Sequence, residues 1–249
     1  MKHTRAMATL TRSWRLLRSF RFEQTAPHVF YGGLAADTAA LADALCRDLG
    51  TSLDGARVLD VGGGPGYFAD AFAAHGAQYF GVEPDAGEMS AAGIRLASAV
   101  RGDGTALPFR DGAFNVTYSS NVAEHIARPW DMGAEMLRVT RPGGIVMLSY
   151  TVWLGPFGGH ETGLWQHYLG GAFARDRYTR VHGRPPKNVF GTSLFAVSAR
   201  DGLDWGRAHG AAAMFPRYHP AWAWWVTRVP VLREFLTSNL VVVIKKEPA

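Results

Sequence analysis

Cysteine is nearly absent from the chain, because Cys46 is the only one among 249 residues. A single thiol excludes a disulfide within the chain and any metal site built from several cysteines, and it fits a reducing compartment. Long apolar runs are also missing, since nothing approaches the ~18 uncharged apolar residues of a membrane span. No apolar stretch behind a basic start leads to a small-residue cleavage site either. We therefore expect a soluble, cytoplasmic protein.

Acidic residues are missing from the start of the chain, up to Phe22. The same stretch carries six basic residues: Lys2, Arg5, Arg12, Arg15, Arg18 and Arg21. Because the whole chain has a net charge of +5, this arm accounts for its basic character and the remainder is close to neutral. A face that binds nucleic acid needs cations spread over the folded domain, near each phosphate. We therefore expect no nucleic-acid partner.

The basic arm has the pattern of an amphipathic helix. At about 100° per residue its arginines gather on one side and its large apolar residues on the other; the apolar set is Leu10, Trp14, Leu16, Leu17 and Phe20. The favoured interpretation is an arm that packs its apolar side on the domain and leaves its arginines in solvent. A peripheral membrane contact and an organelle transit peptide are the alternatives.

From residue 56 onward, predicted strands alternate with predicted helices, which indicates a parallel sheet covered on both faces. The strands are expected at 57–61, 78–83, 99–102, 114–119 and 145–150, and the helices at 67–74, 87–96 and 130–140. Pro27 breaks the pattern of the arm, and a further helix is expected at 37–49. The turn at 141–144 should lead into the fifth strand.

After Tyr150 the alternation stops. A stretch rich in glycine, histidine and aromatic residues precedes a helix near 198–208, for which Ser198 is a plausible cap. The last strand candidates are 211–215 and 240–244. We therefore divide the chain into an N-terminal helical arm, 1–52, and one α/β domain, 53–249, with a lid insertion at about 151–238.

A glycine-rich turn follows the first predicted strand. Gly62, Gly64 and Gly66 lack a Cβ and adopt positive φ at little cost, so the backbone of this turn can approach a ligand closely. The residues from Gly64 to Ala69 can be aligned with the dinucleotide pattern G-x-G-x-x-A. A nicotinamide-dependent oxidoreductase is therefore one reading of the turn.

Three carboxylates at the ends of successive strands favour another cofactor. Asp60 precedes the turn, where it can accept hydrogen bonds from loop amides or receive the ammonium group of an amino-acid-like ligand. Glu83 ends the second strand, where it can bind both hydroxyls of a ribose. Asp103, with Gly104, follows the third strand and can read the edge of an adenine. A dinucleotide enzyme leaves Asp60 and Asp103 unexplained.

Five ordered motifs make the chain similar to a known family. They are VLDVGGGPGYF (58–68), GVEP (81–84), GDGTALPF (102–109), NVAEHI (121–126) and LRVTRPGG (137–144). Together they resemble the class I S-adenosylmethionine-dependent methyltransferases, and most of all the type 11 subgroup. The resemblance covers about 56–150. Gly63 departs from it slightly, because the family often has cysteine or another small residue there.

The resemblance implies a Rossmann-like sandwich, with a mostly parallel seven-stranded sheet, one antiparallel strand and helices on both faces. It assigns Asp60 and the glycine turn to the methionine part of S-adenosylmethionine, and Glu83, with Pro84 beside it, to the ribose. It assigns Asp103 and Gly104 to the adenine, and Asn121 to the rim beside the sulfonium. The strand candidates 211–215 and 240–244 would supply the antiparallel pair.

Methyl transfer from a sulfonium needs alignment above all, and it needs a base only when the acceptor keeps its proton, as a hydroxyl does. His125 and His160 are the candidates for that base. A loop histidine held by backbone is the simpler reading of His125, and a solvated loop residue of the predicted lid is the simpler reading of His160. A metal site from His160, Glu161 and His167 is not expected, because no ligand pattern supports it.

Six of the eight tryptophans follow the fifth strand: Trp153, Trp165, Trp205, Trp222, Trp224 and Trp225. Most of them should pack in the core, but the group at 222–225 could line a pocket for a bulky acceptor. Together with the basic arm, this favours O-methylation of a lipid-linked or glycosylated small molecule. The rivals are the nicotinamide-dependent oxidoreductase and a non-catalytic methyltransferase-like binding protein. The sequence predicts no oligomeric state.

Overall fold

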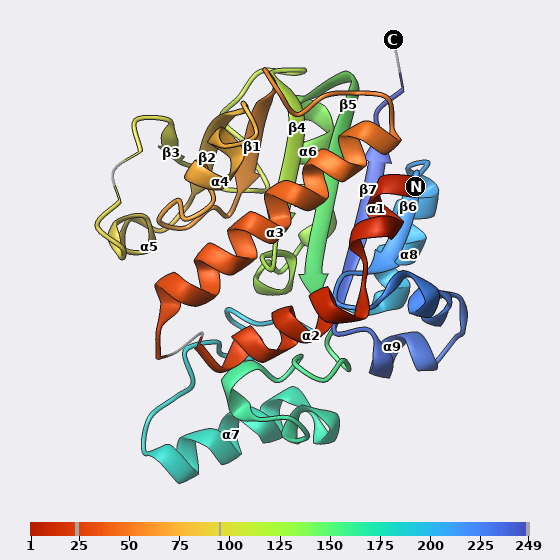
Figure 1. Ribbon diagram of the computed structural model, residues 1–249. Coiled ribbons are helices and arrows are strands. Elements are labelled where there is room, and N and C mark those ends of the chain that lie inside the picture. The colour runs from red at the N-terminus through yellow and green to blue at the C-terminus, as the bar shows by residue number, and fades with distance from the viewer. Residues whose placement is uncertain (23–24, 95, 248–249) are drawn as a thin grey trace.

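The computed structural model describes residues 1–22, 25–94 and 96–247. Its seven strands form one sheet in the order β3-β2-β1-β4-β5-β7-β6 (Figure 1). The strands are β1 Arg57–Val61, β2 Gln78–Glu83, β3 Ala99–Arg101, β4 Phe114–Ser120, β5 Thr140–Thr151, β6 Ala213–Pro216 and β7 Asn239–Lys245. Among these strands only β7 runs against its neighbours, because it pairs antiparallel with both β5 and β6. The predicted fold class is confirmed.

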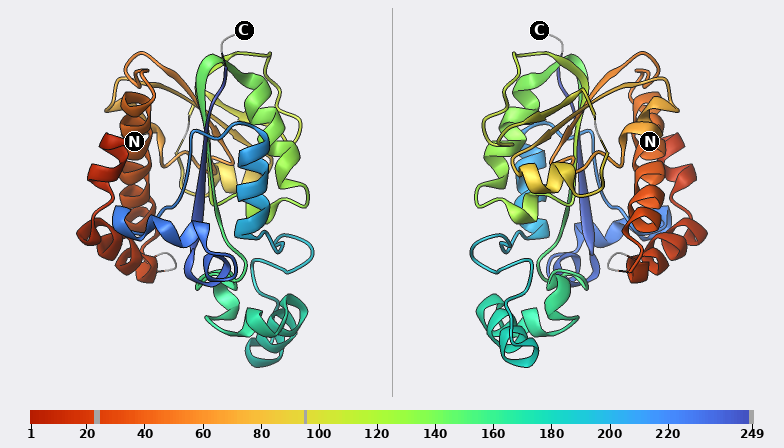
Figure 2. Two further views of the ribbon diagram at one scale, coloured as in Figure 1. Left: turned by 90° about the vertical axis from the view of Figure 1, so that its right-hand side faces the viewer. Right: turned by 90° about the vertical axis from the view of Figure 1, so that its left-hand side faces the viewer.

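Helices cover both faces of this sheet (Figure 2). On one face lie α1 Lys2–Met7, α3 Pro27–Asp48 and α4 Ala69–Ala73, and on the other lie α6 Pro129–Val139 and α8 Ala199–Ala208. Alternate strand residues supply the two cores, as the two-residue period of a strand requires. Val58 and Met147 pack towards α3, and Leu59 and Leu148 pack towards α6 and α8.

Three predicted boundaries moved. Pro27 is the first residue of α3 and not a break, because the first helical position needs no N–H and suits the fixed φ of proline. β5 takes in the predicted turn 141–144, since Gly143 N donates to Lys246 O and Lys246 N donates to Gly144 O. The helix after β2 is short, α5 Ala86–Ser90; Gly93 follows it with a φ of 68°.

By length and composition α3 could cross a membrane, with 22 residues and a mean hydropathy of 1.2 in its most apolar window. Asp37 and Asp43 lie within it, so no uncharged apolar run marks it in the sequence. In the structure 61% of that window is buried, and the helix covers one face of the sheet (Figure 1). A core helix of this kind meets the same criterion of length and composition as a membrane span.

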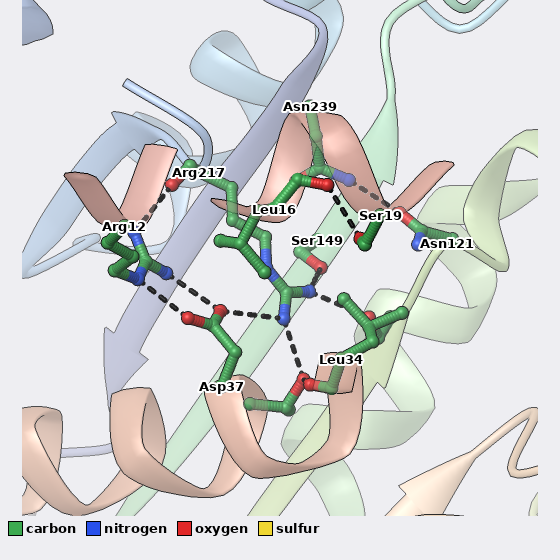
Figure 3. A network of polar contacts seen from close by, with 11 residues as sticks. Arg12, Leu16, Ser19, Leu34, Asp37, Asn121, Ser149, Arg217 and Asn239 are labelled. Carbon is green, nitrogen blue, oxygen red and sulfur yellow. Dashed lines mark hydrogen bonds and ion pairs between the residues drawn. The ribbon is translucent and has the colours of Figure 1, made fainter. Parts of the chain in front are cut away.

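The arm is tied to the sheet by buried charges (Figure 3). Arg12 lies on α2, Leu10–Ser19, and its guanidinium donates to both carboxylate oxygens of Asp37 on α3, at 2.7 and 2.8 Å. Arg217, which follows β6, donates to Thr38 Oγ1 at 2.6 Å and to Ser120 Oγ at 2.8 Å. These contacts join α2, α3 and the end of β4.

This network overturns the predicted sides of the arm. Arg12 is buried, whereas Leu10 and Trp14 are 65% and 61% exposed. The physical reason is the carboxylate of Asp37, which pairs with the Arg12 guanidinium inside the protein and compensates its desolvation. The exposed side of α2 therefore mixes apolar and basic residues, because Arg15 and Arg18 are exposed as well.

The insertions gather at the carboxyl end of the parallel strands (Figure 1). After β5 the chain forms η3 His160–Thr162, η4 Gln166–Leu169 and α7 Gly171–His182, and the last of these was not predicted. Between β6 and β7 it forms η5 Ala221–Arg228 and α9 Leu232–Leu236. Ser198 caps α8 as expected, accepting from Asp201 N.

Candidate functional site

The glycine turn leaves β1 with its backbone open to a ligand. Gly62, Gly64 and Gly66 have φ of 82°, 51° and 90°, which L side chains rarely adopt. A Cβ at Gly62 would lie 2.5 Å from the side chain of Val122. The amides of Gly62 and Gly63 donate to Val82 O, at 2.9 and 3.3 Å, so the end of β2 holds the turn. The turn is therefore a cradle that side chains would fill.

Glu83 braces the same turn from the end of β2. Its carboxylate accepts from Gly64 N and from Asp85 N, both at 3.2 Å. The side chain is half-buried, and burial raises the pKa of its carboxyl while the two amide bonds oppose the shift. Pro84 beside it is exposed, and its carbonyl accepts from Arg101 Nε. A half-buried carboxylate next to the glycine cradle suits a ribose diol.

Asp60 is buried behind the turn and holds three strands together. One carboxylate oxygen accepts from Tyr79 Oη of β2, at 2.7 Å, and from Tyr118 Oη of β4. Burial raises the pKa of Asp60 to about 7, against the lowering by the two tyrosine bonds. The sequence suggested loop amides as partners, but the structure gives it tyrosine hydroxyls.

Asp103 and Gly104 follow β3 in a tight turn. Asp103 is exposed and accepts from both Thr105 N and Thr105 Oγ1, at 2.8 and 2.9 Å. Gly104 packs close to β1, because a Cβ there would lie 3.2 Å from Val61 Cγ1. The loop after β3 therefore reaches the end of β1, from which the glycine turn starts. The structure thus places Gly104 against the end of β1, with Asp103 directly before it in the chain.

Asn121 turns the chain out of β4 with a positive φ of 59°. Its side-chain oxygen accepts from Asn239 Nδ2 of β7 at 2.6 Å, and its backbone N–H donates to Ser149 O of β5. Because Gly62 lies against Val122, Asn121 and the short helix η2, Ala123–His125, stand next to the glycine turn. The role of Asn121 beside the sulfonium stays a prediction.

His125 and His160 come together although 35 residues separate them in the sequence. Their rings meet edge to face with centroids 5.1 Å apart. His125 Nδ1 lies 2.7 Å from Ser193 O, and His160 Nδ1 lies 3.2 Å from Gly158 O. Burial lowers the pKa of His160, and its φ of 47° marks a strained backbone.

Glu124 lies beside this pair of histidines, although it was not among the site residues predicted from the sequence. It is 1% exposed, and its Oε1 accepts from Thr151 N at 3.0 Å. Its Oε2 is buried and has no hydrogen-bond partner among the described residues. Each of Glu124, His125 and His160 offers a ligand atom within 4.8 Å of the other two. The adjacent Glu124 and His125 in the motif NVAEHI were the signal in the sequence that could have identified Glu124 as a site residue.

Glu161 and His167, which the sequence grouped with His160, are held elsewhere. Glu161 accepts from Asn188 N at 2.6 Å and from Asn188 Nδ2 at 3.0 Å. His167 Nε2 lies 3.2 Å from Gly155 O, and burial lowers the pKa of its imidazole. Both carboxylate oxygens of Glu161 are therefore bound by Asn188, one by its backbone N–H and the other by its side chain.

The tryptophans at 222–225 do line a pocket, of about 390 Å³, together with Arg5 of the arm and Phe215 of β6. This pocket lies beside the edge strand β6, four strand positions from β1 in the sheet order. At about 4.8 Å per position the separation is roughly 19 Å. An acceptor there would sit far from the glycine turn.

Comparison with known proteins agrees with this geometry. A family model described as a methyltransferase domain matches residues 59–148. An uncharacterized methyltransferase of Mycolicibacterium gilvum is 65% identical over 244 residues, covering 96% of this chain and 95% of the relative. Another uncharacterized methyltransferase, from Mycobacterium avium, is 62% identical over 246 residues, with 96% and 97% covered.

Solved structures share the fold. An S-adenosylmethionine-dependent methyltransferase from Thermotoga maritima superposes with a TM-score of 0.53 at 17% identity, covering 94% of this chain and 100% of that one. A second, from Mesorhizobium loti, gives a TM-score of 0.52 at 18% identity, with 82% and 96% covered. At these identities the likeness concerns the fold alone.

Proposed function

The chain belongs to the methyltransferase family, and from this premise we propose that it methylates a hydroxyl group of an apolar, lipid-like acceptor, with S-adenosylmethionine as the donor. When bound, S-adenosylmethionine supplies a methyl group on a sulfonium: the C–S bond breaks as the C–O bond forms, S-adenosylhomocysteine is left, and the hydroxyl proton passes to a base.

The cradle supports the assignment of the donor. The turn of Gly62, Gly64 and Gly66 would admit the methionine part, with Asp60 behind it for the ammonium group. The carboxylate of Glu83, beside Pro84, would bind the ribose hydroxyls. Because Asp103 and Gly104 lie beside the end of β1, they would bind the adenine. Asn121 would form the rim beside the sulfonium.

The observation that carries the acceptor class is a group of exposed apolar side chains on the insertions, which we call the apolar rim. Each is at least 41% exposed, and the group comprises Leu164, Trp165, Tyr168, Leu169, Phe173, Leu232, Phe235 and Leu236. The ring centroids of Tyr168 and Phe235 lie 5.9 Å apart, so the apolar rim connects η4 with α9. Clustered exposed apolar side chains are typical of binding sites for apolar ligands or membranes.

The arm adds a basic, aromatic face at the same end of the molecule (Figure 1). Leu10 and Trp14 are exposed on α2 together with Arg15 and Arg18, and the Arg18 guanidinium lies 5.7 Å from the Trp14 ring centroid. Arginines beside apolar anchors suit the surface of an anionic membrane. We propose that the enzyme meets its acceptor there, on the cytoplasmic side.

His125 and His160 are the groups that we assign to the acceptor hydroxyl. His125 stands on η2, which follows β4, and His160 stands on η3 of the lid. They could act as the base itself, or as ligands of a cation that acidifies the hydroxyl. Either role needs the two imidazoles on the acceptor side of Asn121.

Radiolabelled methyl transfer into a bacterial extract, separated into lipid, polar and RNA fractions, tests the acceptor class. We expect label in the lipid fraction, and a loss of at least about tenfold in Leu169→Ser and Phe173→Ser with unchanged affinity for S-adenosylhomocysteine. Asp176→Ser, on the same helix as Phe173 and also exposed, is the matched control. Label confined to the polar or RNA fraction would reject the acceptor class.

A further inference from the structure

Glu124 presents a buried oxygen that nothing satisfies among the residues described. Its Oε1 is bound by Thr151 N at 3.0 Å, but Oε2 has no partner. A buried carboxylate oxygen without a hydrogen bond is costly, and such groups are normally paired or bound to a metal. The unsatisfied oxygen therefore points to a ligand that compensates it.

The two neighbouring imidazoles are oriented as metal ligands are. His125 Nδ1 and His160 Nδ1 each face a backbone carbonyl oxygen, of Ser193 and Gly158. A carbonyl accepts, so the ring proton of each histidine belongs on Nδ1 and its Nε2 keeps a free lone pair. Histidines that bind metals are held in this way by a backbone carbonyl or a carboxylate.

We propose that Glu124, His125 and His160 bind one divalent transition-metal cation. Two imidazoles and one carboxylate are a donor set that Zn²⁺ and related ions accept, and three protein ligands leave a position open. The ligand atoms lie within 4.8 Å of one another, so small side-chain rotations bring them onto one ion.

The cation would join two parts of the site. Glu124 and His125 stand on η2 after β4, whereas His160 stands on η3 of the lid. Binding would therefore fix the lid to the edge of the sheet beside Asn121. The open position would take the acceptor oxygen and favour its deprotonated form. Only this last step rests on the proposed methyl transfer to a hydroxyl, because cation binding itself is independent of the acceptor.

Titration of the tag-free, chelator-treated full chain with Co²⁺, followed by its visible absorption, and with Zn²⁺ by calorimetry tests the proposal. We expect one ion per chain, and an affinity at least about 100-fold lower in Glu124→Gln, His125→Asn and His160→Asn. His209→Asn removes an exposed histidine at the C-terminal end of α8, and should bind as the wild type does.

Affinity for S-adenosylhomocysteine, measured on every variant, reports whether the cofactor half of the site has kept its fold. If the wild type binds no ion, or if two folded variants of the cluster bind as tightly as the wild type, the cation site is wrong. That result would leave the methyltransferase proposal standing, with the imidazoles as free bases. Tight cation binding without label in any lipid would instead reject the acceptor class alone.

Discussion

Replacing Asp60 by asparagine should remove a pH dependence from the stability of the fold. Burial raises the pKa of Asp60 from 3.8 to about 7, whereas the unfolded chain has the ordinary value. Below about pH 4 Asp60 is protonated in both the folded and the unfolded state, so its ionisation does not lower the free energy of unfolding. Between pH 4 and pH 7 the unfolded state is ionised while the folded state keeps its proton. The free energy of unfolding therefore falls as pH rises, and the loss is complete above pH 7.

The size of the effect follows from the shift. A change of about three pKa units corresponds to about 4 kcal/mol, at roughly 1.4 kcal/mol for each unit. Asparagine keeps an oxygen that can accept from Tyr79 and Tyr118, but it has no charge to desolvate. The wild type should therefore lose about 4 kcal/mol relative to Asp60→Asn between pH 4 and pH 8.

Urea denaturation of both proteins at half-unit steps from pH 4 to pH 8 measures this difference, and the comparison cancels the groups that the two proteins share. Tyr79→Phe provides a second check. It removes a hydrogen bond that lowers the pKa of Asp60, so it should move the midpoint of the dependence to higher pH. A constant difference between wild type and Asp60→Asn across the range would refute the reasoning.

Two further substitutions test the cradle and the network of Figure 3. Gly62→Ala should abolish binding of S-adenosylhomocysteine in calorimetry, because the new Cβ would collide with Val122 and distort the turn. The positive φ alone should lower the free energy of unfolding by about 1 to 2 kcal/mol. Gly32→Ala, in α3 with open space around it, should stabilise the fold by up to about 1 kcal/mol; equal losses would contradict the cradle. Asp37→Asn should cost about 3 to 5 kcal/mol in urea denaturation, because it leaves buried arginines unpaired. Asp43→Asn, whose partner Arg47 is largely exposed, should cost less than about 1 kcal/mol, and a similar loss in both would be inconsistent with a buried pair.

The strands, the glycine turn and the carboxylates at the strand ends could be placed from the sequence because their signals are local. A buried strand and the glycine turn that follows it lie within a few residues of each other, as at Asp60 and Gly62, and Glu83 is the last residue of the next strand. The order of such units then determines which strand ends meet at one edge of the sheet. The seven-stranded topology with one antiparallel strand, which the family resemblance implied, agrees with the structure.

The acceptor side depends on contacts between distant segments, and local patterns do not encode them. The burial of Arg12 follows from Asp37 on another helix, so a helical wheel placed it in solvent. The pairing of Glu124 and His125 with His160 requires the lid to fold back over β4. The tryptophans at 222–225 were expected to line a pocket for the acceptor. In the structure their pocket lies beside β6, at the edge of the sheet and away from the glycine turn.

Calorimetry of the purified chain with S-adenosylhomocysteine, and separately with NAD, distinguishes a methyltransferase site from a dinucleotide site. The account predicts that S-adenosylhomocysteine binds at one site per chain and that NAD does not bind. It also predicts that Glu83→Gln, which loses about 1.5 to 3 kcal/mol of charge-assisted hydrogen bonding, weakens binding roughly ten- to a hundredfold. Binding of NAD without S-adenosylhomocysteine, or an unchanged affinity in Glu83→Gln, would contradict it.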